Sequence, residues 1–113
     1  MGDRANILIK DGTSKVYLYT HWCGTELPKT LQTALARKLR WDDGQYLARI
    51  IFSEMIKDSL TDECGYGISS VVGDGDSRIL EVNIQKQTVK VITKTISTYT
   101  FKEYLALKEP KWE

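Results

Sequence analysis

Residues 42–58 read DDGQYLARIIFSEMIKD, and the rest of the chain is organised around this stretch. On a helical wheel its apolar side chains fill a continuous arc of about half the circumference. These side chains belong to Leu47, Ala48, Ile51, Phe52, Met55 and Ile56. Asp42 or Asp43 would cap the helix, and Asp42 with Gln45 has the spacing of a capping box. The stretch therefore predicts a central helix that buries more apolar surface than any other segment.

Two β-rich runs, residues 6–10 and 16–22, precede this helix, and residues 11–15 join them. A connection of this length fits a β-hairpin. Alternation along the second run predicts that Tyr17, Tyr19 and His21 share one face of the strand. The other face then carries Val16, Leu18, Thr20 and Trp22. Because both faces carry bulky side chains, we expect this strand to lie inside the sheet.

Helical spacing of Leu31, Leu35 and Leu39 predicts a first amphipathic helix over residues 28–40, which Pro28 would begin. After the central helix, three short β-rich runs with tight connections predict a β-meander. They cover residues 68–72, 79–84 and 88–93.

The C-terminal part leaves two alternatives open. Residues 94–99 either extend as a further strand or cross the surface. Thr100 and Glu103 have the capping-box spacing, which predicts a short C-terminal helix. Residues 108–113 form a tail in which Trp112 is either folded back or free to meet a partner.

Together these elements predict a single α+β domain over residues 1–113. We expect an antiparallel sheet of about five strands in ββααβββ order, with two main helices on one face and a short C-terminal helix. The length suits one domain with a core that needs neither metal nor disulfide.

Charge and composition restrict the class of partner. Sixteen Lys and Arg residues against fifteen Asp and Glu residues give a net charge of +1. This balance argues against nucleic acid as the partner. Arg37, Lys38 and Arg40 form one modest basic cluster, which we interpret as a solvated helix end rather than a phosphate-binding patch.

The sequence also predicts where the protein acts. No segment reaches about 18 uninterrupted apolar residues, and the N-terminal residues lack a signal-peptide pattern. We therefore expect a cytoplasmic protein without membrane attachment, in which Cys23 and Cys64 stay reduced. A disulfide between them remains an alternative if the protein meets an oxidising compartment.

Four motifs carry a resemblance: MGDRAN at residues 1–6, LYTHW-x-G at 18–24, YLARIIF at 46–52 and GYGIS at 65–69. In this combination the chain resembles, over residues 1–105, a small family of proteins of similar length encoded in bacterial genomes and often in phages and prophages. That family has no assigned activity, so the resemblance implies a setting and no catalytic residues. It implies a phage-borne protein directed at the host, such as an inhibitor of a defence system. Cys23 stands where the family pattern has a glycine or a variable residue.

The sequence gives little support for a metal site, a catalytic cysteine or a phosphate-binding loop. His21, Cys23 and Cys64 could supply three zinc ligands, but no C-x-x-C pair supports such a site. A Cys23 nucleophile with a His21 base would place the pair about 6–7 Å apart on a strand, too far for direct contact. Gly65–Gly67 fits a tight turn rather than a phosphate loop, and Asp74–Ser77 fits a hairpin turn rather than a calcium loop. We therefore predict no catalytic residue, no metal ligand and no cofactor.

One group of aromatic and basic residues is a candidate ligand-binding site. Aromatic faces beside one Arg and one His suit a planar or anionic ligand such as a nucleotide. The residues are Tyr17, Tyr19, His21, Trp22, Arg49 and Tyr66. Ordinary packing is the alternative: the tyrosines cover the sheet, and Arg49 pairs with Asp42, Asp43 or Glu54.

Three functions follow. The favoured one is a non-enzymatic interaction protein that occupies a host protein through an exposed aromatic strand face. The second is a small-ligand binder, such as a nucleotide sponge, built on the group of residues above. The third is a small hydrolase or nuclease centred on His21, against which the lack of a carboxylate cluster or nucleophile motif argues. A homodimer is compatible with each of them.

Overall fold

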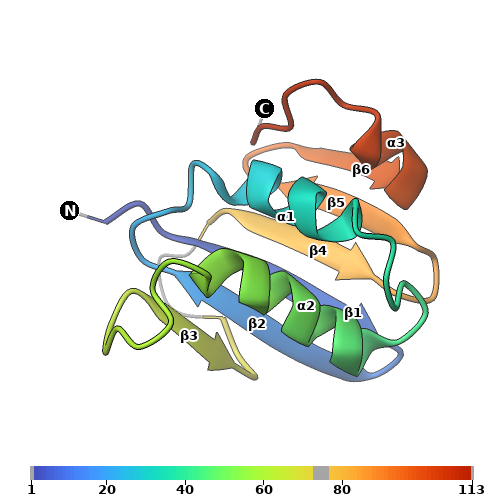
Figure 1. The fold of residues 1–113 in the computed structure, drawn as a ribbon. Helices are drawn as coiled ribbons and strands as arrows, with labels where there is room; N and C mark the ends of the chain where they lie inside the picture. The colour runs from blue at the N-terminus through green and yellow to red at the C-terminus, as the bar shows by residue number, and fades with distance from the viewer. Residues whose placement is uncertain (1, 73–76, 113) are drawn as a thin grey trace.

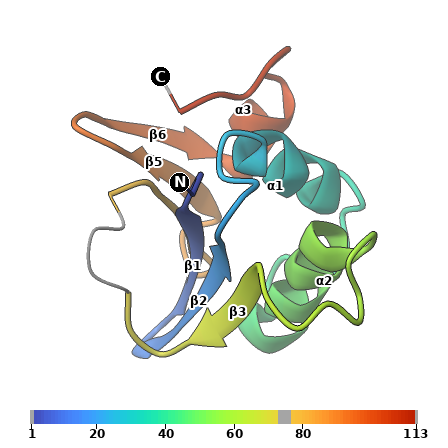
Figure 2. The same ribbon diagram turned by 90° about the vertical axis from the view of Figure 1, so that its left-hand side faces the viewer.

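The computed structural model describes residues 2–72 and 77–112, which form one six-stranded mixed sheet with three helices on one of its faces (Figures 1 and 2). The helices are α1 (Leu27–Leu35), α2 (Gly44–Ile56) and α3 (Phe101–Leu105). The strands are β1 (Ala5–Asp11), β2 (Ser14–Thr20), β3 (Tyr66–Ser69), β4 (Ile79–Asn83), β5 (Thr88–Ile92) and β6 (Ile96–Thr100). Their order across the sheet is β3-β2-β1-β4-β5-β6. The predicted α+β class, with the two main helices on one face, is confirmed.

The sheet differs from the prediction in three respects. It has six strands within the described ranges rather than about five, because residues 96–100 form the edge strand β6. The pair β1–β4 is parallel, whereas all other neighbours are antiparallel. The predicted three-strand meander is wrong in its first member, since β3 pairs with β2 at the opposite edge from β6. Among the strands of the described ranges, β4, β5 and β6 are the ones that form a meander.

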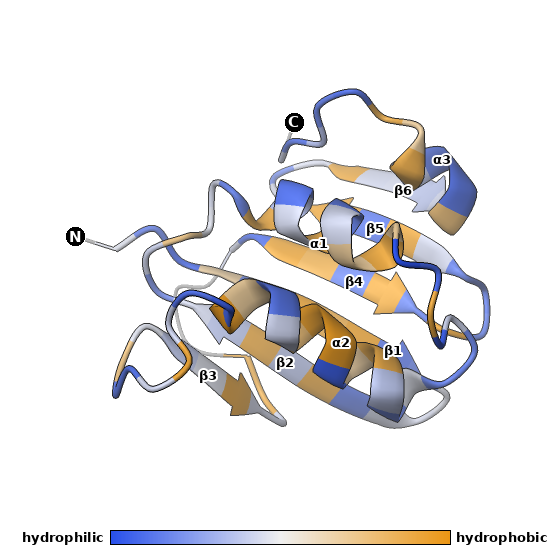
Figure 3. Ribbon diagram, in the orientation of Figure 1, coloured by the Kyte–Doolittle hydropathy of each residue, from blue (hydrophilic) through white to orange (hydrophobic). Residues whose placement is uncertain are grey.

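The core lies between the helices and the sheet face that they cover. Among its most deeply buried members, each at most 1% exposed, are Ile7, Leu18, Leu80, Val82 and Val89 from the sheet, and Leu31, Leu35, Leu47 and Ile51 from the helices. Figure 3 shows apolar and more polar residues alternating along β2, as expected for a sheet with helices on one face only, whereas β1 carries the apolar run of residues 7–9. The parallel register sets Ile7 beside Leu80 at the centre of this core.

The face of the sheet away from the helices carries the other half of each strand. Tyr17, Leu8, Glu81 and Lys90 stand next to one another across β2, β1, β4 and β5. Glu81 and Lys90 form an ion pair at 3.9 Å. Leu8 is only 6% exposed and Tyr17 is half-buried, so this face is not an open aromatic surface.

The predicted central helix is present but begins at Gly44. Asp43 is the N-cap, and its carboxylate accepts a hydrogen bond from the Tyr46 N–H at 3.3 Å. The Asp11 carboxylate accepts a second from the Gly44 N–H at 3.1 Å. Two carboxylates thus fill the positive end of α2. The cap is Asp43, and the Asp42–Gln45 capping box is not the one that forms.

The first helix is shorter than predicted, because α1 ends at Leu35 rather than near residue 40. Lys38 and Arg40 have φ angles of 55° and 58°, in the left-handed region that no helix can continue through. The basic cluster therefore lies in the connection to α2, where Arg40 stacks on the Tyr46 ring at 4.4 Å.

The C-terminal segment is tied back to α1. Thr100 and Glu103 form the predicted capping box of α3. The Tyr104 hydroxyl donates to the carbonyl of Pro28 at 2.7 Å, and burial raises the pKa of this phenol. Trp112 is folded back, with its indole N–H donating to the carbonyl of Gly24 at 2.7 Å. The turn predicted at Asp74–Ser77 lies, except for Ser77, outside the described residues.

Candidate functional site

The aromatic cluster at the end of β2 lies on the sheet face away from the helices. The Tyr19 Oη and the His21 Nδ1 are 2.7 Å apart in a hydrogen bond. The His21 ring meets the Trp22 ring edge to face, with 4.8 Å between centroids. Tyr17, Tyr19 and His21 are half-buried, while Trp22 is 54% exposed. Tyr17, Tyr19 and His21 share this face, as the alternation along the strand predicts, whereas Trp22, predicted for the opposite face, packs its ring against His21.

Arg49 lies on the other side of the sheet. It belongs to α2 and lines a groove between that helix and the strands β2 and β3, together with Leu18, Phe52 and Ile68. Leu18 points to the helix side, opposite in direction to Tyr17 and Tyr19. The sheet therefore separates Arg49 from His21, and the six predicted residues do not converge on one pocket.

Tyr66 also lies on the helix side, packed against the core. Its hydroxyl donates to the Cys23 Sγ at 3.4 Å. This hydrogen bond and partial burial raise the pKa of Tyr66 to about 12. Cys23 is half-buried, Cys64 is exposed, and both thiols are free. No group of His, Cys, Asp and Glu within residues 2–72 and 77–112 is arranged to hold a metal ion.

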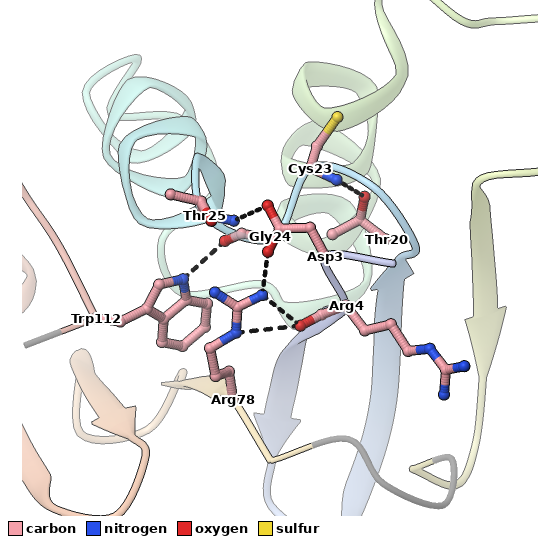
Figure 4. Close-up of polar contacts among 8 residues, drawn as sticks. All are labelled: Asp3, Arg4, Thr20, Cys23, Gly24, Thr25, Arg78 and Trp112. Carbon is pink, nitrogen blue, oxygen red and sulfur yellow. Dashed lines mark hydrogen bonds and ion pairs between the residues drawn. The ribbon is translucent and has the colours of Figure 1, made fainter. Parts of the chain in front are cut away.

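A polar clasp, missed by the sequence analysis, joins the first residues to the start of β4 (Figure 4). The Arg78 guanidinium pairs with the Asp3 carboxylate and donates to the carbonyl of Arg4 at 2.8 and 3.2 Å. The other Asp3 carboxylate oxygen accepts from the Thr25 N–H at 2.9 Å. The Arg78 guanidinium also lies 5.3 Å from the Trp112 ring. Each of these groups has a partner within the chain, so the clasp is structural.

Several exposed large apolar side chains belong to β3 or to the segments next to it. Trp22 is 54% exposed, Ile68 62%, Val71 68% and Leu60 73%. Trp22 lies beside the start of β3, since a Cβ built on Gly65 would come within 2.9 Å of the Trp22 ring. We call this set of four residues the β3 apolar patch. Single exposed apolar residues are normal on a protein surface, whereas larger exposed apolar surfaces are typical of interaction sites.

Beside the patch lies the groove that contains Arg49. It has a volume of about 230 Å³ and an almost wholly apolar lining. Besides Arg49, its lining residues are Val16, Leu18, Gln45, Ala48, Phe52 and Ile68. The sequence analysis missed Ile68 as a surface residue because it placed residues 68–72 inside a meander. The available signal was the run CGYGISSVV over residues 64–72, which carries no charge.

Comparison of the chain with protein-family models, with curated proteins and with solved structures finds no match in any of the three. None of the helices described here is both long and apolar enough to cross a membrane.

Proposed function

We propose that this protein is a non-enzymatic interaction protein whose partner docks at the β3 end of the sheet. The observation that carries the proposal is the β3 apolar patch with the adjoining groove. Removal of such an apolar surface from water by a protein partner lowers the free energy of the system and so favours binding. In keeping with the phage-family resemblance, we further propose a cytoplasmic action on a host protein, such as a component of a defence system.

The site differs from the one first expected. The half-buried faces of Tyr17 and Tyr19 offer a partner less apolar surface than Ile68 and Val71 do. The opposite edge of the sheet has one exposed large apolar residue in the described chain, Ile96 on β6, at 63%. The two edges of the sheet are therefore unequal, and the β3 edge is the stronger candidate.

The two alternative functions receive less support. A nucleotide sponge needs Arg49 and His21 to face one ligand, and they lie on opposite sides of the sheet. A hydrolase centred on His21 needs that ring to meet a carboxylate or a nucleophile, whereas its ring contacts are with Tyr19 and Trp22.

The proposal is tested by affinity capture from bacterial lysate with three forms of the full chain. The wild type is compared with Ile68→Asp and with Ile96→Asp, which places the same charge on an equally exposed isoleucine of the other edge strand. We expect one host protein to be retained by the wild type and by Ile96→Asp but lost with Ile68→Asp. If no retained protein depends on Ile68, the proposal is wrong.

A further inference from the structure

The hydrogen-bonding pattern of β3 determines which backbone groups face outward at this edge. The His21 N–H donates to the carbonyl of Gly65 at 2.9 Å, one pair before the β2–β3 ladder begins. Hydrogen-bonded pairs alternate along an antiparallel ladder. Gly67 and Ser69 therefore bond to β2, while Tyr66 and Ile68 direct their N–H and carbonyl groups away from the sheet. These outward groups form a template for a further strand.

The groove lies directly beside this template. Ile68 has its side chain on the helix side, where it lines the groove with Leu18 and Phe52. In a strand added to β3, the residue paired with Ile68 would direct its side chain to the same side. An aliphatic side chain at that position would cover Ile68 and the groove.

Arg49 indicates the charge of the occupant. Its backbone carbonyl accepts from the Ser53 hydroxyl, but its guanidinium has no ion-pair partner in the described parts of the chain. The alternative pairing of Arg49 with Asp42, Asp43 or Glu54 does not form; Asp43 pairs with Arg40 and Glu54 with Lys57. Arg49 is exposed, so its guanidinium is available to pair with a carboxylate of the occupant at the rim of the apolar groove.

The same residue argues against a second copy of this chain as the occupant. Two β3 strands paired antiparallel about a twofold axis would present the same helix-side surface to each other. Arg49 would then approach the Arg49 of the other copy, and like charges oppose such pairing.

We propose that β3 binds an extended segment of the partner protein as an added antiparallel strand. In that segment an aliphatic side chain faces Ile68 and the groove, and an acidic side chain two residues away meets Arg49. This inference rests on the proposed function, because it names the kind of partner segment that the β3 end takes.

The test uses a random peptide library selected against the immobilised full-length chain. We expect enriched peptides with an aliphatic and an acidic residue two positions apart. When such a peptide binds the isotope-labelled protein, hydrogen exchange should slow at the N–H groups of Tyr66 and Ile68. Exchange at Gly67 and Ser69 should change little, since those groups already bond to β2.

Variants of the chain separate the two contacts. Ile68→Asp should weaken the selected peptides by at least about tenfold, while Ile96→Asp leaves them unchanged. Arg49→Gln should weaken them by roughly 2- to 5-fold, an effect that disappears when the acidic residue of the peptide is replaced by its amide.

Three outcomes would overturn strand addition. They are a failure to enrich any peptide, protection at amides other than those of Tyr66 and Ile68, and a monomer–dimer equilibrium that Ile68→Asp abolishes. The last would make a second copy the occupant. A host protein whose capture depends on Ile68, found without protection at these amides, would leave the proposed function standing and remove strand addition alone.

Discussion

The side-chain Nε2 of Gln32 donates to the carbonyl oxygen of Leu107 at 2.7 Å, although the two residues are 75 positions apart. The same amide donates to the carbonyls of Tyr104 and Leu105 at 3.2 and 3.4 Å. Gln32 is only 7% exposed and belongs to α1. One buried side-chain amide therefore bonds to the carbonyls at and just after the end of α3.

Replacing this residue tests that role. We expect Gln32→Met to lower the free energy of unfolding by about 2–3 kcal/mol, because it keeps the side-chain shape but leaves carbonyls unpaired. Urea denaturation measures the loss. The control is Lys29→Met, which removes only the 3.1 Å hydrogen bond from the exposed Lys29 amine to Gln32 Oε1. Equal effects of the two variants would contradict the capping role.

Titration of Tyr66 gives a second prediction. Its pKa is raised to about 12, chiefly by the hydrogen bond that its hydroxyl donates to Cys23. The folded state therefore holds this proton more tightly than the unfolded state, in which tyrosine ionises near pH 10. The resulting stabilisation is present below pH 10 and is lost as the pH rises toward 12.

Separate from the still later signal of the buried Tyr104, ultraviolet titration should accordingly show a phenolate signal near pH 12 that Tyr66→Phe removes. Cys23→Ala should move that signal to lower pH, because it removes the hydrogen-bond acceptor. A signal near pH 12 that survives Tyr66→Phe would contradict the assignment, whereas the later signal of buried Tyr104 should persist in both proteins.

The free energy of unfolding at acid pH depends on the ion pair between Asp3 and Arg78 in the clasp. The hydrogen bond from Arg78 lowers the pKa of Asp3 below its unfolded value of 3.8. The clasp therefore stabilises the fold above about pH 4, and this contribution is lost as the carboxylate is protonated at lower pH. Asp3→Asn should cost roughly 1 kcal/mol near neutral pH. The difference from the wild type should shrink as the pH falls below about 4 and the carboxylate takes up its proton, as measured by urea denaturation across pH. A difference independent of pH would contradict an ionic role for Asp3.

The loop after α1 offers a stabilising change. Lys38 is exposed and has a φ angle of 55°, which L side chains adopt at a cost. We expect Lys38→Gly to raise the free energy of unfolding by about 0.5–1 kcal/mol. Arg37→Gly is the matched control and should destabilise, since Arg37 is not among the residues with positive φ. Thermal denaturation of both variants tests whether Lys38→Gly stabilises the fold and Arg37→Gly destabilises it.

Local patterns in the sequence were sufficient to predict most of the helices and strands. The 3.6-residue period identified α2, and the Thr100–Glu103 spacing identified the start of α3. The end of α1 was missed because Lys38 and Arg40 adopt left-handed conformations without the glycine that usually signals them. Helices and their caps depend on interactions between residues close in sequence, so the sequence pattern predicts them well.

The sequence pattern did not predict which strands from distant segments pair with one another. Nothing in residues 66–69 indicates that they pair with β2 rather than with β4, since both pairings suit an uncharged short strand. The same is true of the parallel pair β1–β4, on which the Arg78 clasp depends. Arg49 and His21 were grouped because each suited a ligand chemically, but the pleat of β2 and the position of α2 set them on opposite sides.

The central claim is that the β3 end of the sheet contacts a partner protein inside the cell. Photo-crosslinking tests it most directly, with a photoreactive phenylalanine analogue placed at Ile68 in one form of the chain and at Ile96 in another. The two positions are matched, at 62% and 63% exposure on opposite edge strands. We predict that position 68 yields a covalent adduct with one host protein and that position 96 does not yield it. No adduct from position 68, or the same adduct from both positions, would contradict the account.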